Sequence, residues 1–197
     1  MNRFKMLVLV GAAGVALAGP AKAQFFGQMG PLEGMSSGHT LFGAYIGLAD
    51  GSVGPMAEFR ASSGKHATAG IAASVEHSVF GLQVDARGGL TGTGGEYPLE
   101  LGGQLAAGLL TGGGSTGIYA QAVPGLSFEW DAGEGRSFST WAGLGLRITA
   151  ASHNSGGSNG MIRVGTRYNF SPSVGFSAAL EDVGGSSRFL AGVGYTY

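Results

Sequence analysis

Apolar and polar residues alternate along most of the chain after residue 38. In the final segment, Phe189, Ala191, Val193, Tyr195 and Tyr197 share one parity, and smaller or polar residues fill the other. Successive side chains of a β-strand point to opposite faces, so a period of two predicts a strand with one apolar face. Such segments recur between clusters of Gly, Ser, Asp and Pro. The predicted strands cover residues 39–49, 56–62, 67–76, 80–87, 99–111, 117–129, 138–148, 162–170, 174–180 and 188–197.

This pattern predicts an all-β protein of about ten strands, or eight if one pair has been divided wrongly. The parity of apolar positions reverses near His77, which predicts a tight turn there. Pro124 lies inside a predicted strand and cannot donate to a ladder, which predicts a bulge or a local kink. Closing the strands into an antiparallel barrel would give each of them two neighbours.

The composition favours a barrel in a membrane over a soluble sandwich. The chain has 40 Gly among 197 residues and only 12% charged residues, whereas soluble domains contain about 7% Gly and about 25% charged residues. The parity opposite the apolar one contains Gly, Ala and Ser, with few Lys or Glu. The outer face of a soluble sandwich would be polar and charged. We therefore predict a closed transmembrane β-barrel.

The first 23 residues have the features of a secretory signal peptide. Arg3 and Lys5 precede the apolar run 6–18, and Ala21-Lys22-Ala23 supplies a small-x-small cleavage pattern. The expected organisation is a signal peptide over 1–23, a flexible leader over 24–37 and a barrel over 38–197. Without the signal, 8 basic residues face 12 acidic ones, a formal net charge of −4, which argues against a nucleic-acid partner. The absence of Cys excludes disulfides and thiolate chemistry.

Most charged residues of the predicted strands fall on the parity that would face the lumen. Acids are more frequent in the first six strands and arginines in the last four, so closure is expected to bring opposite charges together across the lumen. Two interpretations stay open: a structural ion-pair network filling a narrow interior, and a charged constriction that selects solutes. The predicted lumen-lining charges are Glu58, Arg60, Glu76, Asp85, Arg87, Glu100, Glu129, Arg147, Arg163, Arg167, Glu181 and Arg188.

The C-terminal strand carries a family resemblance. Gly192, Tyr195 and the terminal Tyr197 are similar to the C-terminal assembly signal of bacterial outer-membrane β-barrels, although Leu190 stands where that signal usually has a polar residue. The chain thus resembles small barrels of the OmpA/OmpW-like superfamily. The resemblance implies an outer-membrane location, contact with membrane lipid and with the assembly machinery, and a structural or passive small-solute pore role without catalysis or cofactor.

Two other functional classes are weighed against this one. His153 and Ser155 form a His-x-Ser motif similar to the dyad of outer-membrane lipid A deacylases, but Gly156 replaces the Asn of that family and no acidic residue follows before Glu181. The other class is a secreted Gly-rich adhesin. The four His residues show no ligand spacing, so no metal site is expected. The oligomeric state is left open.

Overall fold

The computed structural model describes residues 39–49, 52–62, 67–76, 78–89, 99–112, 114–152 and 157–197. The predicted signal peptide and leader lie outside these residues. The ten strands are β1 (Thr40–Ala49), β2 (Ser52–Ser62), β3 (Ala67–Glu76), β4 (Val79–Gly89), β5 (Leu99–Gly112), β6 (Ser115–Gly133), β7 (Arg136–Ala151), β8 (Gly157–Asn169), β9 (Val174–Val183) and β10 (Ser186–Thr196). Within the described part of the chain, no helix is both long and apolar enough to cross a membrane.

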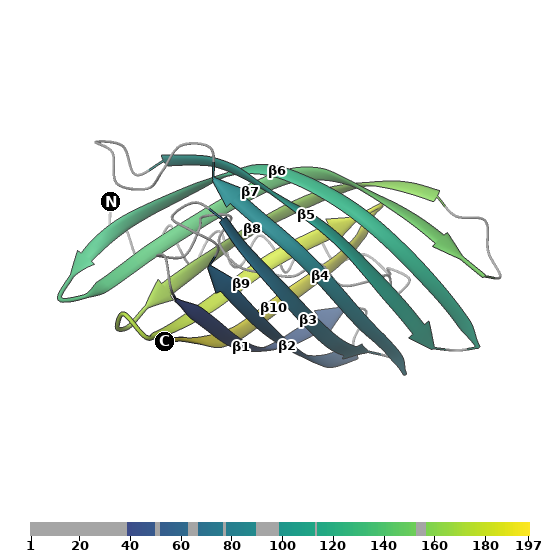
Figure 1. Cartoon of the computed structure of the whole chain (residues 1–197), viewed down its shortest axis with the longest axis horizontal. Coiled ribbons are helices and arrows are strands. Elements are labelled where there is room, and N and C mark those ends of the chain that lie inside the picture. Colours follow the sequence, from purple (N-terminus) through teal and green to yellow (C-terminus); the bar gives the residue numbers. More distant parts are fainter. Residues whose placement is uncertain are drawn as a thin grey trace.

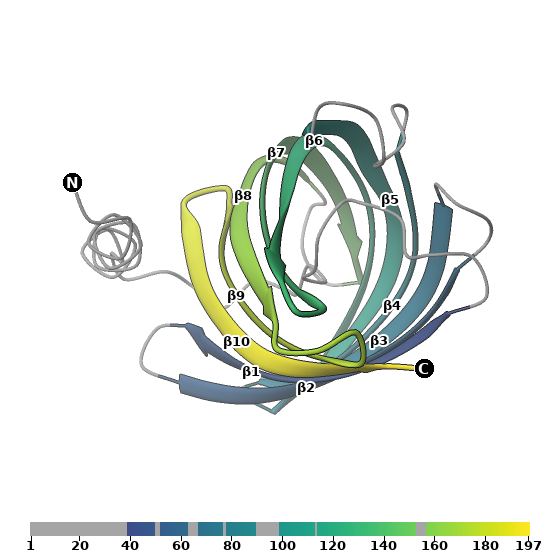
Figure 2. The ribbon, with the colours of Figure 1, turned by 90° about the vertical axis from the view of Figure 1, so that its left-hand side faces the viewer.

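The strands form one closed ring (Figures 1 and 2). Each strand pairs antiparallel with its neighbours in sequence, and β1 pairs with β10 over eight residue positions, from Leu41 opposite Thr196 to Leu48 opposite Phe189. This last ladder removes the two edges that an open sheet would have. The predicted all-β antiparallel barrel is confirmed, with ten strands rather than eight.

Strand lengths differ from the prediction at several ends. β2 begins at Ser52 rather than at Met56, so the connection predicted over 50–55 is shorter. Pro55 has no backbone N–H to donate. It is tolerated because β2 pairs with β3 only from Met56 onward, so that Pro55 has a ladder partner in β1 alone. β6 and β7 are also longer than predicted and arch across the barrel in Figure 1.

Of the bulge or local kink predicted at Pro124, the bulge is absent. The β6–β7 register is the same on both sides of it, with Ala122 opposite Leu146 and Gly125 opposite Gly143. Val123 and Pro124 have no ladder partner in β7, while Pro124 still pairs with Gly103 of β5. The missing N–H of Pro124 therefore coincides with a gap in the β6–β7 ladder, but β6 has no extra residue there. The register shift between β6 and β7 lies instead at Asp131 to Gly133, next to the turn.

Alternation places large apolar side chains on the outside of the barrel and polar ones inside. Outward Leu105, Leu144 and Val53 are 67%, 66% and 64% exposed, whereas inward Arg163, Glu58 and Glu181 are each 2% exposed. A soluble protein shows the opposite arrangement. The apolar parity identified in the sequence is thus the outer face.

Inward glycines make room for inward aromatic rings. Tyr45 faces Gly192 across β1 and β10, Tyr119 faces Gly108 across β5 and β6, and Trp141 faces Gly165 across β7 and β8. A Cβ on any of these three glycines would overlap the ring of its partner. Each ring therefore lies over the bare backbone of the adjacent strand, the aromatic rescue of a strand glycine that barrels use. Neighbouring aromatic side chains thus occupy the space beside these inward glycines.

Close strand approach at Gly145 gives a test of the packing. A Cβ there would come within 2.9 Å of Val123 Cα and closer still to the Ala122 carbonyl oxygen, so backbone would have to move. We expect Gly145→Ala to lower the free energy of unfolding by about 1–3 kcal/mol. The measurement is denaturant unfolding in detergent micelles, followed by Trp fluorescence. Gly160→Ala, where nothing lies within 4 Å, is the control and should leave stability nearly unchanged.

Candidate functional site

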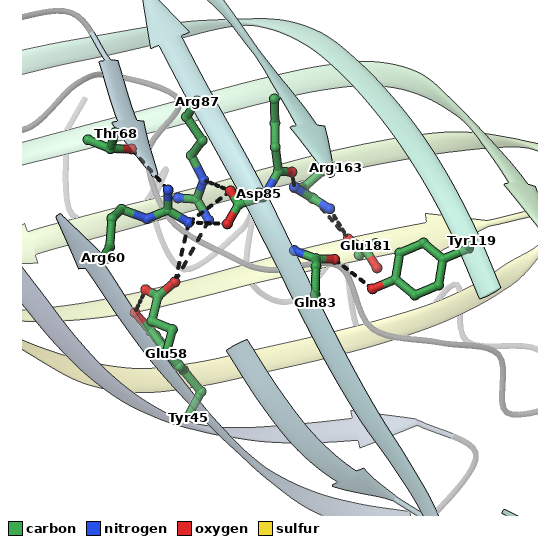
Figure 3. A network of polar contacts seen from close by, with 11 residues as sticks. Tyr45, Glu58, Arg60, Thr68, Gln83, Asp85, Arg87, Tyr119, Arg163 and Glu181 are labelled. Atoms are coloured by element: carbon green, nitrogen blue, oxygen red, sulfur yellow. Dashed lines mark hydrogen bonds and ion pairs between the residues drawn. The ribbon is translucent and has the colours of Figure 1, made fainter. Parts of the chain in front are cut away.

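The inside of the barrel is the candidate site, because the charged residues gather there. Of the twelve charges predicted to line the lumen, eleven are buried and Glu129 is half-buried. Four carboxylates and five arginines among them form ion pairs, in two clusters linked by an amide. Figure 3 shows much of this network.

The first cluster is centred on Asp85 of β4. Arg60 Nη2 of β2 lies 2.7 Å from Asp85 Oδ1 and 2.8 Å from Oδ2, and Arg87 Nε donates to Oδ2 at 3.1 Å. Gln104 Nε2 of β5 donates to the same oxygen at 2.7 Å. Asp85 thereby receives donors from three side chains, which compensates for its loss of water.

Glu58 extends this cluster towards β1. The Tyr45 hydroxyl donates to Glu58 Oε1 at 2.6 Å, and both Arg60 Nη2 and Arg87 Nη2 lie 3.8 Å from Oε2. Thr68 accepts a hydrogen bond of 2.9 Å from Arg60 Nη1. Tyr45 thus has two roles, since its ring covers Gly192 and its hydroxyl holds one carboxylate of the network.

The second cluster surrounds Glu181 of β9. Arg163 Nε of β8 donates to Glu181 Oε2 at 2.9 Å, while Arg147 and Arg188 lie 3.6 and 3.8 Å from Oε1. Arg147 Nη2 also donates to Gln121 Oε1 at 2.8 Å, and its guanidinium lies 4.8 Å from the centre of the Tyr119 ring. One buried carboxylate therefore holds three arginines.

Gln104 joins the two clusters. Its amide nitrogen donates to Asp85, and its carbonyl oxygen accepts a hydrogen bond of 2.5 Å from Arg163 Nη1. Gln104 is 1% exposed and lies on β5, three strands away from Arg163 on β8. A continuous polar network therefore runs through the interior from β1 to β10. Gln104 was not among the predicted lumen-lining residues, which were all charged. Its parity, the same as that of Glu100, was the one feature of the sequence that placed it inside.

The pairing pattern differs from the expected one. Acids of the early strands were expected to pair with arginines of the late strands, but Arg60 and Arg87 pair with early acids, and Arg147 and Arg163 pair with a late acid. The pair of Arg188 with Glu76 at 3.6 Å does join the two halves. The pairs within each half join residues of one strand or of strands no more than two apart. Because strands are spaced by about 5 Å, long arginine side chains can span this separation along the wall without crossing the lumen.

Apolar residues also lie buried inside the barrel, and the sequence analysis did not predict them. Tyr45, Met56, Trp141, Ala179 and Leu190 form a buried cluster, and Leu190 is 0% exposed. A cavity of about 10 Å³ beside Gln83 and Tyr119 has room for one water molecule at most. Met56 and Leu190 have the same parity as the charged residues of their strands, and this parity could have predicted that both face the lumen.

The remaining predicted residues have different positions. Tyr195 and Tyr197 lie on the outer face, 52% and 61% exposed, with their rings stacked 6.1 Å apart. His39 is exposed, and its backbone N–H donates to the Ser62 hydroxyl. His153 and Ser155 lie outside the described residues. Among the described residues, no three His, Cys, Asp or Glu side chains form a group able to hold a metal ion.

Loss of a central carboxylate should be costly. We expect Asp85→Asn to lower the free energy of unfolding by about 3–5 kcal/mol, because Arg60 and Arg87 would stay buried with their main partner uncharged. Denaturant unfolding in micelles measures the change. Glu134→Gln is the control, since its ion pair with Arg136 is exposed, and a change below about 1 kcal/mol is expected there. Equal stability of the two variants would contradict a structural role for the network.

Comparisons with known proteins found no matching family and no matching curated relative. Among solved structures, the KdgM porin is similar at 10% identity, covering 80% of this chain and 99% of its own, with a TM-score of 0.43. The N-terminal β-barrel domain of Pseudomonas aeruginosa OprF is similar at 10% identity, covering 83% and 100%, with a TM-score of 0.40. The attachment invasion locus protein Ail of Yersinia pestis is 16% identical, covering 84% and 99%, with a TM-score of 0.31.

Proposed function

We propose that this protein is a bacterial outer-membrane β-barrel with a structural role, whose lumen is held closed by its ion-pair network. The observation that carries the proposal is the inverted arrangement of its side chains. Large apolar residues cover the outer wall with exposures up to 67%, and charged residues lie inside. Contiguous apolar surface of this extent is unfavourable in water and favourable in lipid.

Aromatic side chains support the proposed location in a membrane. Tyr195 and Tyr197 lie at the end of β10, and Phe128 and Trp130 lie near the end of β6, with ring centroids 4.6 Å apart. Tyr168 and Phe170 lie at the end of β8, with ring centroids 5.0 Å apart. In an antiparallel barrel the ends of even-numbered strands lie at the same rim, here called the C-terminal rim. Aromatic girdles lie at both membrane–water interfaces of a barrel, so we expect these rings to place the C-terminal rim at one of them.

The filled interior favours a closed barrel over an open solute pore. Arg147, Arg163, Gln104, Glu58 and Leu190 are each no more than 2% exposed and come from strands around the ring. Moving one of these side chains aside would separate a buried charge from its partners or open the apolar cluster. Either step is costly, so passage of solutes requires rearrangement of the network.

Gel mobility and conductance test this function. We expect the protein to fractionate with outer membranes and to migrate faster on a denaturing gel before boiling than after it. In planar bilayers it should show little or no steady conductance at neutral pH. Steady open channels would overturn the closed lumen and favour a passive pore. Absence from the membrane fraction, together with no change of mobility on boiling, would overturn the barrel in the membrane and favour a secreted protein.

The outer face gives a second test. Leu144 is 66% exposed in the middle of β7, so Leu144→Arg should destabilise the barrel in lipid vesicles by about 2–4 kcal/mol, the cost of a cation near the bilayer centre. Ser115→Arg, at an exposed strand end, is the control and should change stability by about 1 kcal/mol or less. If both variants have the same stability in vesicles, Leu144 does not face lipid.

A further inference from the structure

Not every charged residue inside the barrel has an oppositely charged partner among the described residues. Arg60, Arg87, Arg147, Arg163 and Arg188 form ion pairs with Glu58, Glu76, Asp85 and Glu181. The sixth lumen arginine, Arg167, donates to the side chain of Asn169. Two lumen carboxylates, Glu100 and Glu129, have no cation beside them among the described residues. Both lie near the C-terminal rim.

Glu100 is the more deeply buried of the two. It is 1% exposed, and its Oε2 atom has no hydrogen-bond partner within the described part of the chain. Its Oε1 atom occupies the space where a side chain on Gly89 of β4 would begin. The carboxylate therefore lies along the lumen wall over a glycine. A buried carboxylate without a partner costs several kcal/mol, and this cost calls for a compensating ligand.

Buried hydroxyl groups stand next to these acids. Ser127 of β6 faces Glu100 directly across the β5–β6 ladder, and Ser139 of β7 faces Glu129 across the β6–β7 ladder. Ser127 and Ser139 are 2% and 0% exposed, and neither hydroxyl has a hydrogen-bond partner in the described residues. Directly opposed residues have Cβ atoms about 5 Å apart, so three adjacent strands present four oxygen-bearing side chains to one region of the lumen. The negative charges of Glu100 and Glu129 repel each other.

We infer that Glu100, Glu129, Ser127 and Ser139 form a binding site for a hard divalent cation such as Ca²⁺, inside the barrel at its C-terminal rim. Two carboxylates match the charge of the ion, and hydroxyl oxygens and water complete the six to eight oxygen ligands that Ca²⁺ takes. The cation would give Glu100 and Glu129 the neighbouring positive charge that the arginines give the other four lumen acids. The site goes beyond the proposed structural role and does not depend on whether the lumen conducts.

The position of the tryptophans allows a direct test. The chain has two Trp residues. Trp130 is adjacent in sequence to Glu129, and Trp141 lies inside the barrel two residues from Ser139. Tb³⁺ replaces Ca²⁺ at oxygen sites and emits when a nearby Trp is excited. We expect the protein folded in detergent to give Trp-sensitised Tb³⁺ emission that Ca²⁺ displaces.

Variants assign the emission to these residues. Glu100→Gln and Glu129→Gln should each weaken Tb³⁺ binding at least tenfold, and Ser127→Ala should weaken it less. Glu134→Gln is the matched control, because this exposed acid lies at the same rim and is bound to Arg136. Its emission should equal that of the wild type. A second readout is the unfolding midpoint, which Ca²⁺ should raise in the wild type and leave unchanged in Glu129→Gln.

Several results would overturn the site. Emission that persists in the Glu100→Gln/Glu129→Gln double variant, or that falls equally in Glu134→Gln, would mean binding elsewhere on the surface. No emission and no Ca²⁺ effect on the midpoint would mean that the two carboxylates are neutralised by protons instead. If Glu100→Gln does not fold, Glu129→Gln and Ser127→Ala carry the test. The change of gel mobility on boiling checks folding in each sample, so failure of the site and failure of the barrel are distinguishable.

Discussion

The ladder between β1 and β10 is the constraint on which the rest of the structure depends. In the hydrocarbon of a membrane, where we propose that this barrel lies, no water is available to satisfy backbone N–H and C=O groups, so a sheet there must have no edge. Pairing of Thr40 and Leu41 with the last residues of the chain closes the ring and allows the outer wall to be apolar. The same closure turns the polar parity inward, where charged side chains must find partners within a narrow space.

The interior meets this demand by sharing partners. Asp85 and Glu181 each interact with several arginines, and Gln104 uses both ends of its amide, one towards each cluster. Such a network is stable only when nearly all of its members are satisfied, because in a low dielectric an unpaired group is costly. Glycines opposite Tyr45, Tyr119 and Trp141 contribute by giving large rings room, and these rings occupy volume that would otherwise be empty.

The period of two was enough to predict the strands, the faces and the barrel, because alternation reports directly which way a side chain points. It was not enough to predict partners, since parity says nothing about register. The pairing of Arg60 with Asp85 depends on the relative shift of β2, β3 and β4, which no local pattern of residues encodes. Pro124 shows the same limit. Its missing donor was visible in the sequence, but only the register reveals that no residue is inserted there.

The two acids near the C-terminal rim are informative because, unlike the other four lumen acids, they have no arginine beside them among the described residues. Arg136, the cation nearest to them in sequence, pairs with the exposed Glu134, away from the lumen. A barrel selected only for stability would gain from Gln at position 100, which keeps the shape without a buried charge. Where a local rule is broken and the described residues give no compensation, the compensation is expected from outside them. For two carboxylates beside buried hydroxyl groups, a hard cation is the ligand whose chemistry fits that position.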